Sequence, residues 1–401
     1  MIEHIPPDFK VRGFLAAGIS AGIKKNLEKD LALLYSEVPA AAAGAFTTNR
    51  VKAAPVLISR ERVKAGSTRA VLINSGSANA CTGRRGLLEA RRLSKLIASL
   101  LKVDPQSVLL ASTGVIGRPL PMAAIAKNLP DLVASLSANG LEEAARAIIT
   151  TETFPKATVT RGRVNGQEIT IAGIAKGAGM INPKMATLLS FVLTDASISP
   201  KALQESLKDG VQKSFNRITV DGDTSPNDTL LILANGQAGN REIASDSPGY
   251  RKFSALLHEL VFTLAKMIVR DGEGATKLVE IAVGGARTTS EAERVARAIA
   301  YSPLVKTAFF GEDANWGRIL CAVGNSGIPI NSEKIDVFFD DCDIVRRGQS
   351  TGQEKEDRAT SVMKKREYTV HVNLHRGKKS SSIFTTDFSY DYVKINASYR
   401  S

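Results

Sequence analysis

The chain has 401 residues, of which 43% are hydrophobic and 23% charged, so it is long and apolar enough for one large or two medium cores, and wholesale disorder is excluded. It contains no run of 18 or more apolar residues, and the segment from Met1 to Lys10 lacks the basic and apolar parts of a secretory signal. We therefore expect no membrane span and a cytoplasmic protein.

The net charge is +13, which suits a soluble basic surface or anionic small substrates. The positive residues are scattered and aromatic residues make up only 5%, so the pattern does not favour nucleic-acid binding. Cys81, Cys321 and Cys342 are widely spaced, and the histidines show no ligand pattern, so we expect no metal site. Unpaired cysteines fit a reducing compartment.

Strand-like and helical patterns alternate along the chain and predict a mixed α and β fold. In chain order, the predicted elements are a strand at 70–73, a helix over 86–102, strands at 108–111, 169–174 and 188–193, a helix from 199, a strand at 229–233, a helix from about 255 to 269, a strand at 279–283, a helix after 290–293, and strands at 335–339 and 368–372.

Several of these predictions depend on capping and turn residues. Ser199-Pro200 fits an N-cap followed by proline in the first turn, Ser254 fits an N-cap, and Ser290–Glu293 fits a capping box. Gly348–Arg358 is predicted to be an exposed loop. A boundary near Gly284-Gly285 would divide the chain into a core domain, 1–284, and a smaller α/β domain, 285–401.

The segment Lys176–Ala196 is the most unusual stretch of the sequence. Its first half is rich in glycine and turn-forming residues, whereas Leu188–Leu193 is an apolar strand that we expect to be buried. Thr187 therefore stands where a loop enters a core strand. Such a junction can hold a strained backbone, but the local pattern alone favours an ordinary β-branched strand residue.

The surrounding sequence resembles the ornithine acetyltransferase family, which includes the bifunctional glutamate N-acetyltransferases. The blocks that carry the resemblance are AFTTNRVKAAPV (45–56), INSGSANACTG (73–83), STGVIG (112–117), TTETFPKA (150–157), NRITVDGDTSPNDT (216–229), VRDGEGATK (269–277), DANWGRI (313–319) and INASYRS (395–401), with the MAT triplet at 185–187. They span essentially the whole chain in order. The departures are GSANA for GNANA, NPK for APN, TET for TDT, and INASYRS for INADYTT.

The resemblance implies autocatalytic cleavage between Ala186 and Thr187 into an α chain, 1–186, and a β chain, 187–401. The Thr187 hydroxyl would attack the Ala186 carbonyl, and water would release the two chains. The freed α-amine of Thr187, with a reference pKa of about 8, is then suited to act as the general base for its own hydroxyl. The resemblance thus makes Thr187 the nucleophile.

The resemblance also assigns the remaining site residues. The Thr113 hydroxyl and the Gly114 N–H would stabilise the oxyanion. The substrate would bind Thr150, Lys176, Glu273, Asn396 and Ser401 together with Thr187. Thr151 and Thr153 compete with Thr150 for this role, and Lys176, in a glycine-rich stretch, could instead be a solvated surface lysine.

The family has a layered α-β-β-α sandwich core and forms an α2β2 heterotetramer, and we expect both here. The implied reaction is ping-pong transfer of acetyl from N2-acetylornithine to glutamate in arginine biosynthesis, without a metal or other cofactor. The sequence leaves open whether acetyl-CoA is a further substrate. The alternatives are an N-terminal-threonine aminopeptidase or amidase of the same fold and a non-enzymatic basic binding protein.

Overall fold

The computed structural model describes residues 10–182 and 188–398 and divides the chain into two compact units. Unit 1 comprises Met1–Asn216 and Asp223–Ile268, and unit 2 comprises Arg217–Gly222 and Val269–Ser401. The boundary suggested by Gly284-Gly285 falls inside a strand of unit 2, because the hydrogen bonds of that strand to neighbours on both sides make it internal to the unit. The structure thus places the division earlier in the chain.

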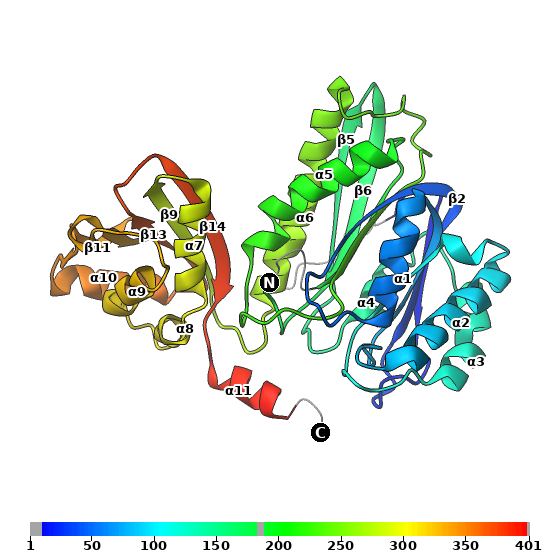
Figure 1. The fold of residues 1–401 in the computed structure, drawn as a ribbon, viewed down its shortest axis with the longest axis horizontal. Coiled ribbons are helices and arrows are strands. Elements are labelled where there is room, and N and C mark those ends of the chain that lie inside the picture. The colour runs from blue at the N-terminus through cyan, green and yellow to red at the C-terminus, as the bar shows by residue number, and fades with distance from the viewer. Residues whose placement is uncertain (1–9, 183–187, 399–401) are drawn as a thin grey trace. The chain divides into compact units, whose positions relative to one another are not determined.

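Unit 1 is built on an eight-stranded sheet (Figure 1). Its strands are β1 (Phe14–Ile19), β2 (Leu31–Phe46), β3 (Ser67–Asn74), β4 (Val108–Ser112), β5 (Lys156–Val164), β6 (Gln167–Lys176), β7 (Leu189–Thr194) and β8 (Thr229–Ala234). The order is β4-β3-β2-β8-β7-β6-β5, and β1 also pairs with β2. The long strand β2 joins the two halves of this sheet, since its first part pairs with β1 and β3 and its last part with β8.

The helices of unit 1 are α1 (Ala54–Arg62), α2 (Gly83–Leu101), α3 (Met122–Ala134), α4 (Leu141–Ile148), α5 (Pro200–Lys213) and α6 (Pro248–Arg270). Apolar residues from both halves of the sheet, such as Ile73 and Phe191, share one core with α4. Successive side chains of a strand point to opposite faces of the sheet, so the face of each half that turns away from this core packs against helices. In one half, Leu72 shares a core with α2 and α3. In the other half, Gly173 lies against Leu260 of α6. The predicted α-β-β-α layering is confirmed.

Unit 2 has a six-stranded sheet in the order β12-β11-β10-β13-β9-β14. Its strands are β9 (Leu278–Ala286), β10 (Asp336–Phe339), β11 (Cys342–Arg346), β12 (Gln349–Ser350), β13 (Glu367–Asn373) and β14 (Lys379–Thr386), and its helices are α7 (Thr289–Ala300), α8 (Pro303–Phe310), α9 (Trp316–Gly324), α10 (Gln353–Met363) and α11 (Tyr390–Ala397). The predicted burial of Tyr368, Val370 and Val372 in β13 is confirmed, and these residues pack in the core of the unit.

Two helix starts differ from the sequence-based expectation, whereas Ser199 does cap α5 by accepting from the Ala202 N–H. Ser254 is buried inside α6 and accepts a hydrogen bond from Ser206 on α5 (Oγ–Oγ 2.9 Å), so the prediction that it caps a helix was wrong. At α7 the N-cap is Thr288, which accepts from the Glu291 N–H (3.1 Å), so the capping pattern begins before Ser290.

The prediction of an exposed loop over Gly348–Arg358 was also wrong. The segment forms β12 and the first turns of α10, whose Ala359 and Met363 are buried in the core of unit 2. The charged side chains of this segment face outward, and Glu356 accepts hydrogen bonds from Trp316 and Ser350. The many charged residues of this segment belong to the exposed side of α10, and they do not indicate an irregular loop.

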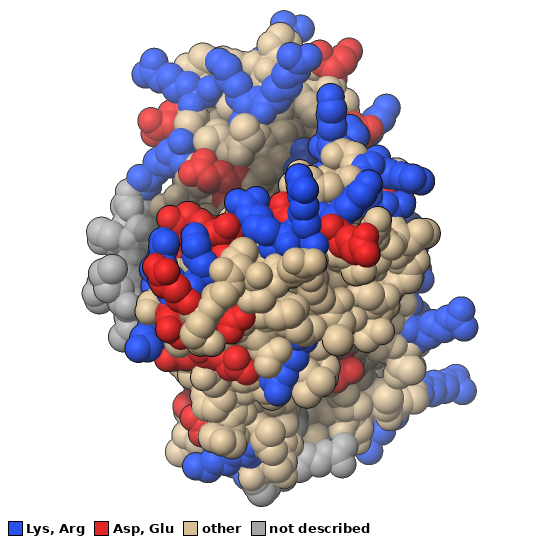
Figure 2. Space-filling view, turned by 90° about the vertical axis from the view of Figure 1, so that its left-hand side faces the viewer, with Lys and Arg blue, Asp and Glu red and all other residues tan. Residues whose placement is uncertain are grey.

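Lysine and arginine side chains lie among carboxylates on the face shown in Figure 2. In the described part of the chain, no helix combines the length and apolar character needed to span a bilayer.

Candidate functional site

The ends of β3 and β4 come into close contact at Gly114. This glycine has a φ of +125°, and a Cβ at its position would come within 2.4 Å of the carbonyl carbon of Gly76. The preceding Thr113 N–H donates to the Asn74 carbonyl (3.0 Å), and the Val115 N–H donates to the Gly76 carbonyl (3.3 Å). Only glycine combines this backbone angle with this approach, so the turn holds Thr113 firmly at the end of β4.

Lys176 joins this turn to the segment that follows α4. It is the last residue of β6, paired with Leu189 of β7, and only 9% of it is exposed. Its ammonium donates to Thr150 Oγ1 (2.9 Å) and to Thr113 Oγ1 (3.2 Å). The interpretation of Lys176 as a solvated surface lysine was therefore wrong, and three residues predicted from the sequence meet in unit 1.

Glu152 completes this cluster and was not predicted from the sequence. Its Oε1 lies 3.0 Å from the Lys176 ammonium, and its Oε2 accepts from the Thr150 hydroxyl (3.3 Å) and from the Thr150 N–H. Burial by itself would raise the pKa of Glu152, but the charges of Lys176 and Lys156 and the hydrogen bonds lower that pKa to about 2. The only sequence signal for Glu152 was its position two residues after Thr150.

Further lysines surround the Glu152 carboxylate. Lys156 is fully buried, with its ammonium 4.8 Å from the centre of the Phe154 ring. Burial lowers the pKa of Lys24, and the charges of Glu152 and other carboxylates only partly oppose that shift. Lys24, Lys156 and Lys176 thus bring positive charge to the surroundings of Glu152, which suits the binding of an anionic group.

Asp228 lies beside the start of β7. Its side chain is buried, and burial raises its pKa well above the usual value despite hydrogen bonds from Ser225, Thr47 and the Leu188 N–H. The Thr229 N–H in turn donates to the Leu188 carbonyl (2.9 Å). Leu188 is thus held on both backbone groups. The predicted scissile pair, Ala186 and Thr187, lies outside the described residues.

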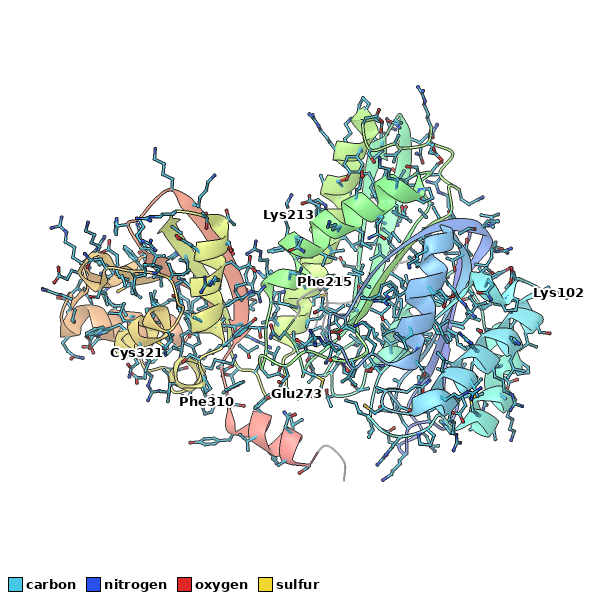
Figure 3. The ribbon with its side chains drawn as sticks, viewed as in Figure 1. Lys102, Lys213, Phe215, Glu273, Phe310 and Cys321 are labelled. Carbon is cyan, nitrogen blue, oxygen red and sulfur yellow. The ribbon has the colours of Figure 1, made fainter. Side chains whose placement is uncertain are left out.

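Two of the predicted substrate-binding residues meet in unit 2. Asn396 on α11 donates through Nδ2 to Glu273 Oε2 (2.9 Å), and Glu273 is only 7% exposed. Figure 3 labels Glu273 in the segment between α6 and β9 and Phe310 at the end of α8, where the Phe310 ring packs edge-on against Tyr390 of α11 (5.4 Å between centroids). Ser401, the third predicted residue of this region, lies outside the described residues.

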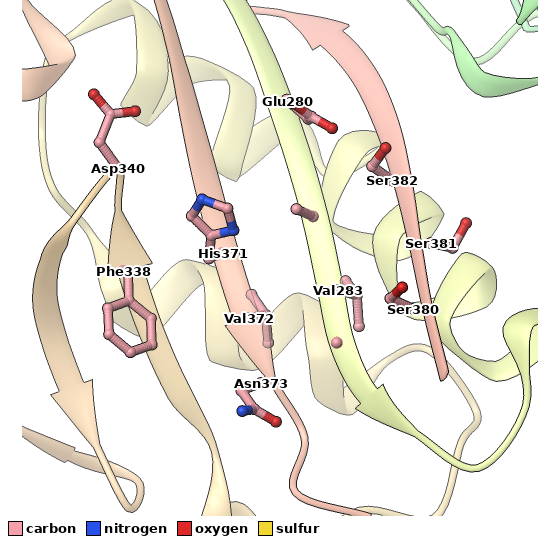
Figure 4. Close-up of a pocket in the computed structure, with 12 residues that line it drawn as sticks. Glu280, Val283, Phe338, Asp340, His371, Val372, Asn373, Ser380, Ser381 and Ser382 are labelled. Atoms are coloured by element: carbon pink, nitrogen blue, oxygen red, sulfur yellow. The ribbon is translucent and has the colours of Figure 1, made fainter. Parts of the chain in front are cut away.

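A hollow of about 630 Å³ lies on the sheet of unit 2 (Figure 4). Its polar lining includes Glu280, Asp340, His371, Asn373 and Ser382. None of the predicted site residues that the structure describes lines this hollow. The described residues also contain no group of three or more His, Cys, Asp or Glu side chains arranged to hold a metal ion.

Comparisons with known proteins agree over nearly the whole chain. The family model of the ArgJ family matches residues 15–401. The arginine biosynthesis bifunctional protein ArgJ of Geobacter sulfurreducens is 52% identical over 390 residues, covering 97% of this chain and 99% of that protein. The protein of the same name from Syntrophotalea carbinolica is 50% identical over 391 residues, covering 98% and 99%. A crystal structure of ArgJ from Bacillus halodurans, 44% identical, covers 52% of this chain and 97% of that chain with a TM-score of 0.50.

Proposed function

Since the chain belongs to the ArgJ family, we propose that it transfers an acetyl group from N2-acetyl-L-ornithine to L-glutamate in arginine biosynthesis. The observation that best supports this proposal is the cluster in which Lys176 joins the hydroxyls of Thr113 and Thr150 beside the turn at Gly114. A lysine-rich, buried cluster with oriented hydroxyls suits an anionic amino-acid derivative and the negative charge that develops during acyl transfer.

The proposed reaction has two acyl-transfer steps. The hydroxyl of Thr187 loses its proton to the Thr187 α-amine and attacks the acetyl carbonyl, while Thr113 and Gly114 donate hydrogen bonds to the oxyanion. Collapse of this intermediate breaks the acetyl–nitrogen bond, and the α-ammonium returns the proton to the departing ornithine. The glutamate amine then attacks the acetyl-threonine ester, which regenerates the Thr187 hydroxyl and yields N-acetylglutamate.

The same hydroxyl would first cleave the chain. Attack of Thr187 on the Ala186 carbonyl converts the peptide bond into an ester, and hydrolysis of that ester frees the α-amine. In support of cleavage, 97% of the solved chain from Bacillus halodurans matches only 52% of this chain. The two products would remain together, because β6 lies in the first chain and β7 in the second, and the two strands form an antiparallel pair. Their pairing extends from Ile171 opposite Thr194 to Lys176 opposite Leu189.

Substrate recognition follows from the charges of the predicted residues. Lys176 and Thr150 would bind the polar groups of the acetylated amino acid, and Glu273 with Asn396 and Ser401 would bind the distal ammonium of ornithine. The reaction itself needs no metal or cofactor. We further propose that the enzyme is a cytoplasmic α2β2 heterotetramer. Assays with acetyl-CoA as the only acetyl donor would show whether the enzyme also acetylates glutamate directly.

Denaturing mass spectrometry of the purified protein tests the cleavage. The wild type should give two chains, the second beginning at Thr187, whereas Thr187→Ala should stay intact at 42.8 kDa and be inactive. Thr187→Ser, which keeps a hydroxyl, is the matched control and should still be cleaved. An intact wild type together with an active Thr187→Ala variant would contradict the proposal. Ornithine release that does not require glutamate would instead indicate an aminopeptidase or amidase.

A further inference from the structure

The Lys176 ammonium has three close oxygen neighbours. They are Thr113 Oγ1 at 3.2 Å, Thr150 Oγ1 at 2.9 Å and Glu152 Oε1 at 3.0 Å. A charged lysine can only donate hydrogen bonds, so the two threonine oxygens accept from it, while Glu152 Oε1 forms an ion pair with it. The Thr113 oxygen therefore uses a lone pair towards Lys176, and the Thr113 proton is left to point elsewhere.

We propose that Glu152 is a positioning residue that acts through Lys176 to set the direction in which the Thr113 hydroxyl donates its hydrogen bond. The inference rests on the proposed function, in which that hydroxyl stabilises the oxyanion. Glu152 need not touch the substrate for this role.

The charge of Lys176 decides the orientation of the hydroxyl. A neutral lysine amine has a lone pair that can accept the Thr113 proton, and this would turn the hydroxyl away from the reacting oxygen. Burial favours the neutral form of a lysine, whereas a carboxylate in direct contact favours the charged form. Glu152, with its side chain fully buried against Lys176, supplies that carboxylate.

The carboxylate is itself held in place. Glu152 Oε2 accepts from both the N–H and the hydroxyl of Thr150, so the carboxylate is tied to the backbone just after α4. Its second oxygen, Oε1, faces Lys176. The chain from Thr150 through Glu152 and Lys176 to Thr113 therefore runs from a fixed backbone position to the proposed oxyanion donor.

Other charged groups face this pair. Lys24 and Lys156 contribute positive charge at Glu152, and the buried Asp228 carboxyl, whose pKa burial raises well above its usual value, also interacts with Lys176. These groups are present in wild type and variants alike, so comparing the two isolates the effect of the Glu152 charge.

The test is steady-state kinetics on the cleaved enzyme with Glu152→Gln and Glu152→Asp. Glu152→Gln keeps the shape but removes the charge, and kcat should fall about 100-fold, with KM for acetylornithine changing far less. Glu152→Asp keeps the charge and should retain most of the activity.

Asp195→Asn serves as the matched control for buried-charge loss in unit 1. Asp195 is a buried carboxylate that pairs with Arg12 (2.8 Å) and accepts from the Thr170 N–H (2.7 Å). Its replacement should lower the melting temperature but leave kcat and KM at wild-type values. Should Glu152→Gln fold poorly, kcat of Glu152→Asp against Glu152→Ala, both measured on the cleaved enzyme, provides the same comparison, since only aspartate keeps the charge.

The outcomes separate this inference from the proposed function. A wild type that is uncleaved or transfers no acetyl group contradicts the proposed function. A cleaved, active wild type whose kcat is unchanged by Glu152→Gln contradicts the positioning role alone. The same holds if Glu152→Asp is as inactive as Glu152→Gln, because the charge would then not be what matters.

Discussion

The amide of Asn396 donates a 2.9 Å hydrogen bond to the carboxylate of Glu273, which ties the last helix of the chain to the segment before β9. A residue close to the end of a chain would ordinarily fray. The hydrogen bond instead orients one carboxylate oxygen of a largely buried glutamate, which is what recognition of a distal ammonium requires.

We expect Glu273→Gln to raise KM for acetylornithine by about 10- to 100-fold, because the proposed charge-assisted hydrogen bond from Glu273 to the substrate ammonium would be lost. Asn396→Ala should raise KM by about 10-fold, since Glu273 remains but is no longer oriented. Initial rates over a range of acetylornithine concentrations measure both effects. Lys394→Ala, an exposed change on the same helix, is the control, and a similar rise in its KM would show that the effect belongs to α11 as a whole.

Gly114→Ala should abolish acetyl transfer and destabilise the protein by about 3 kcal/mol. The new Cβ would require a backbone angle that alanine avoids and would overlap with Gly76. Gly117→Ala is the matched control from the same loop, because its φ is also positive (+83°) but no atom lies within 4 Å of the added Cβ. It should cost only about 1 kcal/mol and leave activity intact. Thermal unfolding and kcat together check this, and equal effects at both glycines would refute the steric argument.

Glu152 should contribute to stability at neutral pH and lose that contribution in acid. Burial raises its pKa, but the neighbouring lysines and hydrogen bonds lower it to about 2, below the ordinary value of 4.5. A lowered carboxyl pKa stabilises the folded state above pH 4.5, and this stabilisation, on the order of 3 kcal/mol, disappears as the pH falls towards 2. Urea unfolding at several pH values should show a steeper acid loss for wild type than for Glu152→Gln. Parallel curves would contradict the prediction.

Lys306 should make the stability of the protein rise with pH above neutrality. It is buried beside Thr385 and Thr386, whose hydroxyls accept from its Nζ at 3.0 Å, and burial lowers its pKa to about 7 although Asp387 and Asp221 oppose the shift. Between about pH 7 and 10.5 the unfolded chain therefore binds more protons at this residue than the folded chain, so alkalinity favours folding. The difference in melting temperature between wild type and Lys306→Met should shift in favour of wild type as the pH rises through this range. Lys379→Met, at an exposed position on β14, should show no such trend.

The fold class and many elements could be predicted from local patterns. The helix over 86–102 matches α2 (Gly83–Leu101) because its apolar spacing marks one buried face, and the alternation at 368–372 matches β13 for the same kind of reason. The long strand β2 was missed. Its alanine-rich centre carries neither a helical nor an alternating apolar pattern, and its conformation is decided by pairing with β3 and β8.

The sequence by itself determined the family, through an ordered set of blocks along the chain, and the resemblance implied site roles for Thr113, Gly114, Thr150 and Lys176. Only the tertiary structure decided that Lys176 is buried at the end of β6 and that Glu152 is its partner. The reason is physical. A local pattern reports which face of an element is apolar, whereas the protonation state and direction of a buried polar side chain depend on groups that the fold brings together from distant parts of the chain.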